Sequence, residues 1–186
     1  MSDELRLSDL PVPRRAPRAP PRSSVLRRVG PGGPGLRAFI REEAWNALWA
    51  HVRAEPSREA GGLLAGLGRR GLVVVHAALP AEETEGGPGH LTFTPEAWRG
   101  MADRLEEALP AWAAVGWFHS HPGIGVSPSG KDLFLHTRFF PEEWQVALIV
   151  DPAGGGTALY RRRGEGLAPA TLEIFSAGRA QAGGGF

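Results

Sequence analysis

The strongest constraint on the fold is an apolar run, WAAVGWF at residues 112–118, that leads directly into His119, Ser120 and His121. A short apolar run of this kind predicts a buried β-strand. Because side chains on a strand point alternately to its two faces, His119 and His121 would share one face and Ser120 would point to the other. The two imidazoles are therefore suited to bind one metal ion together.

The segment after His121, PGIGVSPSGKD, can supply a third ligand. Its glycines allow a sharp turn, after which Asp132 would return to the ion from the first turn of a helix at residues 129–139. The chain contains no cysteine, so disulfides are excluded and any metal site must use His, Asp or Glu. Two imidazoles and one carboxylate leave a fourth tetrahedral position open, as in a catalytic zinc site. Water in that position is acidified to a pKa of about 7.

Each of these motifs also has a simpler interpretation. A His-x-His pair occurs more often as ordinary surface or core histidines, and Ser129-x-x-Asp132 is typical of a helix capping pair. Capping is compatible with metal binding, because it would help to aim the carboxylate. Residues 125–131 fit G-x-x-x-x-G-K, but Asp132 stands where a phosphate-binding loop needs Ser or Thr. Residues 66–71 fit G-x-G-x-x-G but lead into a strand, so they predict a hairpin turn.

Hydrolysis by zinc also needs a carboxylate that takes a proton from water and passes it to the leaving group. Glu59 is the candidate, because it stands at the head of the apolar run EAGGLLAGL. Gly61 and Gly62 would allow close approach of the backbone there, which suits the wall of a site. Taken alone, a glutamate after a turn is usually a solvated residue.

The order of the expected elements predicts an α/β (α+β) fold, a single domain with a central mixed sheet flanked by helices. A helix is expected at residues 41–55, where apolar side chains recur at helical spacing, and a second after Thr94, with Pro95 at its first position. Strands are expected at residues 59–67, 71–79, 90–94, 112–120, 144–150, 157–163 and 171–176.

The two ends of the chain differ from this body in composition. Residues 1–37 carry eight arginines against three acidic residues, and proline is frequent there. We therefore expect residues 1–36 to form a disordered basic leader, residues 37–176 the folded domain, and residues 177–186 a flexible Gly-rich tail. A solvated arm is expected rather than a nucleic-acid interface. No secretory signal and no run of about 18 apolar residues is present, so a cytoplasmic protein without membrane contact is expected.

Together these residues resemble the JAMM, or MPN-plus, metalloprotease family. The family pattern is an upstream Glu at the start of a strand, then H-x-H, then seven residues beginning with Pro, then S-x-x-D. The corresponding residues here are Glu59, His119, His121, Ser129 and Asp132, and the segment REAGGLLAG is similar to the family's E-x-G-G-L-L-x-G. The resemblance extends over about residues 37–175. It implies the MPN/JAMM fold.

The resemblance also implies a chemistry. Zn²⁺ would be held by His119, His121, Asp132 and water, Glu59 would act as general base and then acid, and Ser129 would hydrogen-bond the oxyanion. The expected activity is that of a deubiquitinase-like isopeptidase that cleaves after the C-terminal tail of a ubiquitin-like protein. Conjugation enzymes are expected as further partners, in a bacterial conjugation or defence system.

Two alternatives stay open at this point. One is a hydrolase that releases an amino acid, such as cysteine, from a sulfur-carrier protein with a Gly-rich tail. The other is a non-catalytic scaffold of the same fold, although the complete set of five residues favours an enzyme. The remaining histidines, His51, His76, His90 and His136, have no partner at ligand spacing and are expected to be structural or surface residues.

Overall fold

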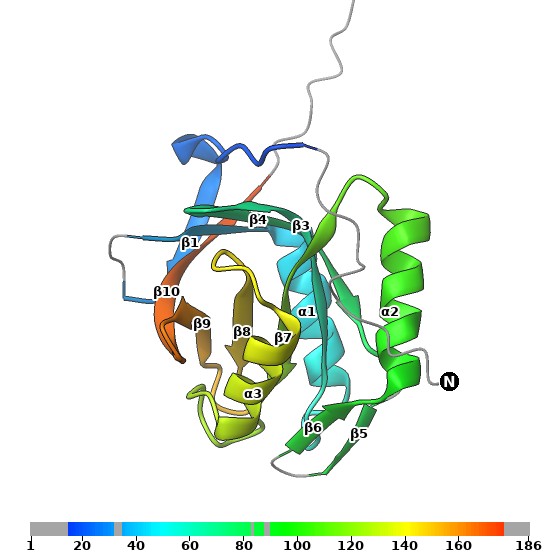
Figure 1. Ribbon diagram of the computed structural model, residues 1–186. Coiled ribbons are helices and arrows are strands. Elements are labelled where there is room, and N and C mark those ends of the chain that lie inside the picture. The colour runs from blue at the N-terminus through cyan, green and yellow to red at the C-terminus, as the bar shows by residue number, and fades with distance from the viewer. Residues whose placement is uncertain (1–14, 32–34, 83, 88–89, 177–186) are drawn as a thin grey trace, which may run out of the picture.

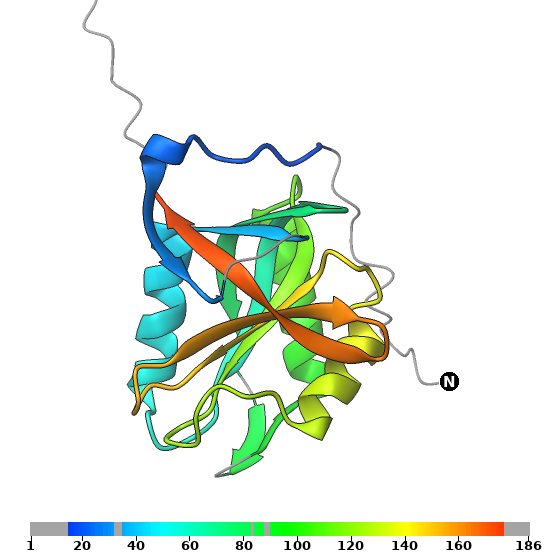
Figure 2. The same ribbon diagram turned by 90° about the vertical axis from the view of Figure 1, so that its left-hand side faces the viewer.

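The computed structural model describes residues 15–31, 35–82, 84–87 and 90–176, and these form a mixed α/β domain around one eight-stranded sheet (Figure 1). The strand order is β1-β10-β2-β4-β3-β7-β8-β9, and β10 pairs also with β9, so the sheet closes on itself (Figure 2). The strands of this sheet are β1 (Val25–Val29), β2 (Arg37–Arg41), β3 (Gly61–Arg69), β4 (Leu72–Pro80), β7 (Ala113–Ser120), β8 (Val146–Val150), β9 (Thr157–Arg163) and β10 (Gly166–Phe175). The predicted fold class is confirmed.

Three α-helices and a small hairpin complete the described fold. The helices are α1 (Glu42–Ala54), α2 (Pro95–Ala108) and α3 (Gly130–Phe139), and a short 3₁₀ turn, η2, spans Arg22–Ser24. A separate two-stranded sheet pairs β5 (Thr84–Gly87) with β6 (His90–Phe93). No helix in the described ranges is both long and apolar enough to cross a membrane.

Helices on both faces of the sheet bury its central strands. On one face α1 packs Leu48 and Val52 into a core with Phe118, and on the other α2 packs Met101 and Leu105 against Trp117. Strands covered on both sides read as continuous apolar runs, which explains the sequence of β7. Full burial of one such large apolar side chain stabilises the fold by about 1.5–3 kcal/mol. The site is therefore built on a strand that is buried along its whole length.

The pairing of β7 with its two neighbours brings three chain segments to one edge of the sheet. Gly61 in β3 pairs antiparallel with His119, and Val150 in β8 pairs parallel with Ser120. The start of β3, the end of β7 and the end of β8 consequently lie side by side. Glu59, two residues before Gly61, is placed at the same edge as the histidines.

Local sequence patterns explain how several elements begin and turn. The side chain of Thr94 accepts a hydrogen bond from the Ala97 amide, with Pro95 at the first position of α2, as predicted. The expected hairpin turn joins β3 to β4, and Gly71 there adopts a φ of 82°. This is the left-handed region, which glycine enters without strain.

The prediction that residues 1–36 are disordered is wrong for residues 22–29. Val25–Val29 forms β1, which pairs antiparallel with β10, and Arg28 Nε donates to Glu173 Oε1 at 2.9 Å. Two features explain this strand. The backbone N–H and C=O groups along one edge of β10 need hydrogen-bond partners, which β1 supplies. In addition, Val25 packs against the buried cluster that contains Phe175. Strands β2 and β5 were also not predicted. Of the expected leader, residues 1–14 and 32–34 lie outside the described residues, as does the expected tail 177–186.

Candidate metal centre

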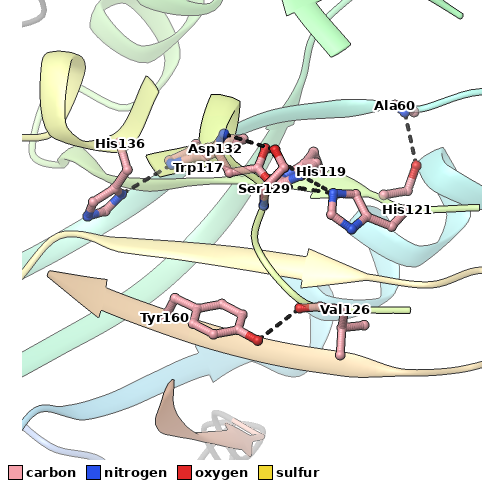
Figure 3. Close-up of polar contacts among 10 residues, drawn as sticks. Ala60, Trp117, His119, His121, Val126, Ser129, Asp132, His136 and Tyr160 are labelled. Atoms are coloured by element: carbon pink, nitrogen blue, oxygen red, sulfur yellow. Dashed lines mark hydrogen bonds and ion pairs between the residues drawn. The ribbon is translucent and has the colours of Figure 1, made fainter. Parts of the chain in front are cut away.

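Three buried side chains converge at the edge of the sheet where β7 ends and α3 begins (Figure 3). His119 Nε2 lies 2.8 Å from His121 Nε2 and 3.1 Å from Asp132 Oδ1, and His121 Nε2 lies 3.5 Å from Asp132 Oδ2. One ligand atom from each residue lies within 4.8 Å of the others. The structure thus brings together the three ligands predicted from the sequence.

Ser120 lies between the two histidines and connects their strand to β3. Its backbone amide donates to the Ala60 carbonyl at 2.8 Å, and its Oγ accepts from the Ala60 amide at 2.9 Å. Ser120 is buried, as are the two histidines. Because Ala60 follows Glu59 directly, these two bonds hold the predicted proton carrier beside the metal ligands.

The loop after His121 is held by Asp151, which follows β8. Gly123 and Gly125 have φ values of 74° and 81°, and their amides donate to Asp151 Oδ1 at 2.9 Å and Oδ2 at 3.2 Å. The Tyr160 hydroxyl donates to the Val126 carbonyl at 2.9 Å (Figure 3). The glycine-rich loop is therefore fixed in place by side chains of neighbouring strands.

A capping box at the start of α3 positions the third ligand. The Ser129 amide donates to Asp132 Oδ2 at 2.6 Å, and Ser129 Oγ accepts from the Asp132 amide at 3.2 Å. The capping interpretation and the ligand interpretation of Ser129-x-x-Asp132 are compatible, because the same carboxylate caps the helix and faces the histidines. Ser129 itself is exposed at the rim of the site.

Charge interactions in the cluster favour an ionised carboxylate between the imidazoles. Burial alone would raise the pKa of Asp132, but hydrogen bonds from His119 and His121 outweigh it and hold that pKa well below its ordinary value. Burial lowers the pKa of His119. Burial would also lower the pKa of His121, but its bond to Asp132 and the nearby charges raise it instead. Burial raises the pKa of Glu59, with His121 opposing the shift.

These residues fit a divalent cation such as zinc. Both Nε2 atoms face each other and the same carboxylate, so a cation at their common point would be bound by all three groups. Two imidazoles and one carboxylate form a donor set found at catalytic zinc sites, where a further position is left for water or substrate. The fold and the site together define a mixed α/β domain with a candidate metal centre.

Comparison with known proteins identifies the family. A sequence model described as prokaryotic homologs of the JAB domain matches residues 41–160, and the protein belongs to this family. The chain is 34% identical over 110 residues to COP9 signalosome complex subunit 5 of Drosophila melanogaster and 32% identical over 133 residues to that of Oryza sativa subsp. japonica. These matches cover 55% and 64% of the chain but 32% and 34% of the relatives, so the chain spans about a third of their length. The resemblance stated from the sequence motifs is confirmed.

Two further matches agree with this assignment. A segment of 53 residues is 42% identical to the 26S proteasome non-ATPase regulatory subunit 14 of Drosophila melanogaster, covering 28% of the chain and 17% of that protein. The solution structure of protein DSY2949 from Desulfitobacterium hafniense superposes with a TM-score of 0.63 at 20% identity. That match covers 75% of this chain and 94% of the other, and shows a shared fold.

Three residues with evident roles at the site were not found from the sequence. Asp151 could have been noticed from its place between an apolar run and the turn PAGGG, where an Asp commonly accepts backbone hydrogen bonds. His136 and Trp117 form a buried hydrogen bond behind the ligands, and no spacing rule indicates it.

Proposed function

We propose that this protein is a zinc-dependent peptidase that cleaves an isopeptide or peptide bond after the C-terminal tail of a ubiquitin-like protein. The observation that carries the proposal is the convergence of His119, His121 and Asp132 beside the buried carboxyl group of Glu59. The relation to COP9 signalosome subunit 5 and to a proteasome regulatory subunit supports this class of substrate.

His119, His121 and Asp132 would hold the ion. When bound, zinc supplies Lewis-acid chemistry, which polarises an amide carbonyl and makes water more acidic. Glu59 is suited to take a proton from the attacking water and return it to the leaving amine, because burial raises its pKa and so makes its protonated form easier to reach. A carboxyl group with its ordinary pKa is almost fully deprotonated near neutral pH, so its protonated form would seldom be present to donate a proton to the leaving amine.

Ser129 is suited to stabilise the oxyanion. Its Oγ accepts a hydrogen bond from the Asp132 amide, so the Ser129 hydroxyl group can still donate a hydrogen bond to the substrate. A single donor to a developing oxyanion contributes about 10²–10³-fold to the rate in other hydrolases. The side chain is exposed while the ligands are buried, so it can reach a substrate at the rim.

A Gly-rich tail fits the proposal because it can bind in an extended conformation, backbone to backbone, along a sheet edge. We further propose that the protein acts in the cytoplasm and that conjugation enzymes supply its substrate. A sulfur-carrier protein has the same kind of tail, so it serves as the competing substrate in the test.

The test is incubation of the purified protein with a ubiquitin-like domain fused through its Gly-rich tail to a reporter, followed by mass spectrometry of the products. Cleavage after the tail is expected, with loss on chelation and recovery on addition of zinc. Glu59→Gln should abolish cleavage and keep zinc bound, whereas Glu107→Gln, at an exposed position of α2, should change neither.

Three outcomes contradict the proposal or a part of it. Turnover retained in Glu59→Gln removes the proposed role of that residue. A wild-type protein that binds no zinc and cleaves nothing is a scaffold of this fold. Cleavage of a sulfur-carrier fusion alone would move the substrate to that class.

A further inference from the structure

The ring of the ligand His119 lies flat against the indole of Trp117. The ring centroids are 4.6 Å apart and the planes are inclined by 9°. A histidine that binds a metal is usually oriented by a hydrogen bond from its second ring nitrogen. Within the part of the chain that the structure describes, His119 Nδ1 is buried and has no hydrogen-bond partner. Apart from His121 and Asp132, which meet its Nε2, Trp117 is therefore the residue whose contact constrains the plane of this ring.

The orientation of Trp117 is in turn set by His136. Trp117 Nε1 donates to His136 Nδ1 at 3.2 Å (Figure 3), and the two residues are 1% and 0% exposed. Phe140 stacks on both rings, at 5.7 Å from His136 and 6.4 Å from Trp117. Phe93 meets the indole edge-on at 6.3 Å. The hydrogen bond selects one of the few orientations that this apolar packing allows.

His136 keeps its acceptor because it stays neutral. Nδ1 accepts the indole proton, so the proton of the neutral ring is on Nε2. Burial, helped by Arg162, lowers the pKa of His136 to about 4. At neutral pH the ring is thus an acceptor at Nδ1 and cannot repel the indole N–H.

We propose that His136 is a positioning residue of the metal centre, which acts through Trp117 to fix the ring plane of His119. The inference rests on the proposed metal site and adds a residue to it. His136 is fully buried, so its influence passes through Trp117. It lies one helical turn after Asp132, and α3 thereby controls two ligands: Asp132 directly and His119 through the indole.

The test compares two substitutions with a matched control. His136→Leu removes the acceptor and leaves a buried indole N–H unpaired, whereas His136→Gln keeps a neutral acceptor. The control is His76→Leu: His76 also stacks on a tryptophan, Trp112, at 4.9 Å, but Trp112 lies at the opposite end of β7 from the ligands. Each folded protein is stripped of metal and titrated with Zn²⁺ against a chromophoric chelator, and with Co²⁺ to record its absorption bands.

We expect His136→Leu to weaken zinc binding by about 10–100-fold and to shift the Co²⁺ bands. The zinc affinity of His136→Gln should stay within about threefold of the wild-type value, and the zinc affinity of His76→Leu should equal the wild-type value. Folded His136→Leu with wild-type affinity and Co²⁺ bands overturns the inference, because a merely structural role changes only thermal stability. A wild-type protein that binds no metal contradicts the proposed function instead.

A second variant covers the case in which His136→Leu does not fold. Trp117→Phe keeps an aromatic ring beside His119 but removes the N–H donor. It should weaken zinc binding to a similar extent. Because Phe has no N–H, His136→Leu in this background leaves no donor unpaired and should weaken zinc binding no further. Additive effects of the two substitutions contradict the proposed chain of contacts.

Discussion

Asp132 and Asp151 are both buried aspartates that hold the loop after β7, yet they differ in what neutralises them. Asp132 faces two histidine side chains and accepts one backbone N–H, from Ser129. Asp151 is surrounded by backbone donors, the amides of Gly123, Gly125, Ala153 and Gly154. Hydrogen bonds from Gly154 and Gly123 lower the pKa of Asp151 as well.

The difference distinguishes a proposed metal ligand, Asp132, from a residue that supports the loop, Asp151. The oxygens of Asp151 are already satisfied by the chain, so this carboxylate fixes the loop without any ion. The oxygens of Asp132 face imidazole nitrogens that can themselves bind a metal, so its charge is balanced best when a cation is present. Loss of Asp132 should therefore affect metal binding, and loss of Asp151 should mainly affect the folded loop.

The largest effect is expected for Asp132→Asn. An amide in place of the carboxylate removes the anionic ligand and keeps the size of the side chain. We expect zinc content, measured by atomic emission after dialysis, to fall far below one per chain, and cleavage to fall by at least about 10³-fold, or about 4 kcal/mol. Asp151→Asn is the matched control and should keep its zinc. Equal loss of zinc in both variants contradicts the distinction between the two aspartates.

Asp151→Ala should have the next largest effect, on stability. It leaves four backbone amides without their acceptor, and a hydrogen bond to a charged group contributes about 1.5–3 kcal/mol. We expect urea denaturation of the metal-free protein to show a loss of that size, with a smaller loss for Asp151→Asn, which keeps one acceptor oxygen. No change in the denaturation midpoint would show that the loop does not depend on this carboxylate.

Gly123→Ala tests the loop conformation itself. A side chain at a φ of 74° is strained by about 1–2 kcal/mol, although an added methyl group would meet nothing closer than Ala153 Cβ at 3.9 Å. Gly130→Ala is the control, since this glycine opens α3 without a positive φ and has open space around it. We expect thermal unfolding to shift downwards for Gly123→Ala and to stay level or rise for Gly130→Ala. The reverse order contradicts the role assigned to the turn.

The smallest effect is on the pH dependence of stability. Because the folded-state pKa of Asp151 is lowered, its contribution is complete above the unfolded-state pKa of about 3.9 and is lost as pH falls through the folded-state value. The difference in unfolding free energy between wild type and Asp151→Asn should therefore narrow below about pH 4. Urea titrations of the metal-free proteins from pH 3 to 7 measure this difference. A gap that widens in acid contradicts the sign.

The parts of the site that could be predicted depend on local geometry. Alternation along β7 places His119 and His121 on one face whatever the rest of the chain does, and the capping pair at Ser129 and Asp132 spans one helical turn. Glu59 was placed by its position at the head of an apolar run. The distance between Glu59 and the histidines depends on the register of β3 with β7, and this register could not be predicted from the sequence.

The parts that were missed depend on contacts between distant segments. Strand β1 exists because β10, more than 140 residues later, offers it an edge, and the arginines and prolines around it indicated disorder. Asp151 acts on a loop 26–28 residues before it. His136 meets Trp117 across 19 residues, and either residue alone reads as ordinary core.

The two hydrogen bonds between Ser120 and Ala60 have a consequence for how the molecule fails. They join the residue after Glu59, the proposed proton carrier, to the strand that carries the histidines, so these groups stay together while β3 and β7 remain paired. Slippage by one residue would turn every side chain of β3 to the opposite face and carry Glu59 away. On warming, the candidate metal centre should therefore stay intact up to the temperature at which the whole sheet unfolds. Hydrogen exchange at the Ala60 amide should be among the slowest of the described residues.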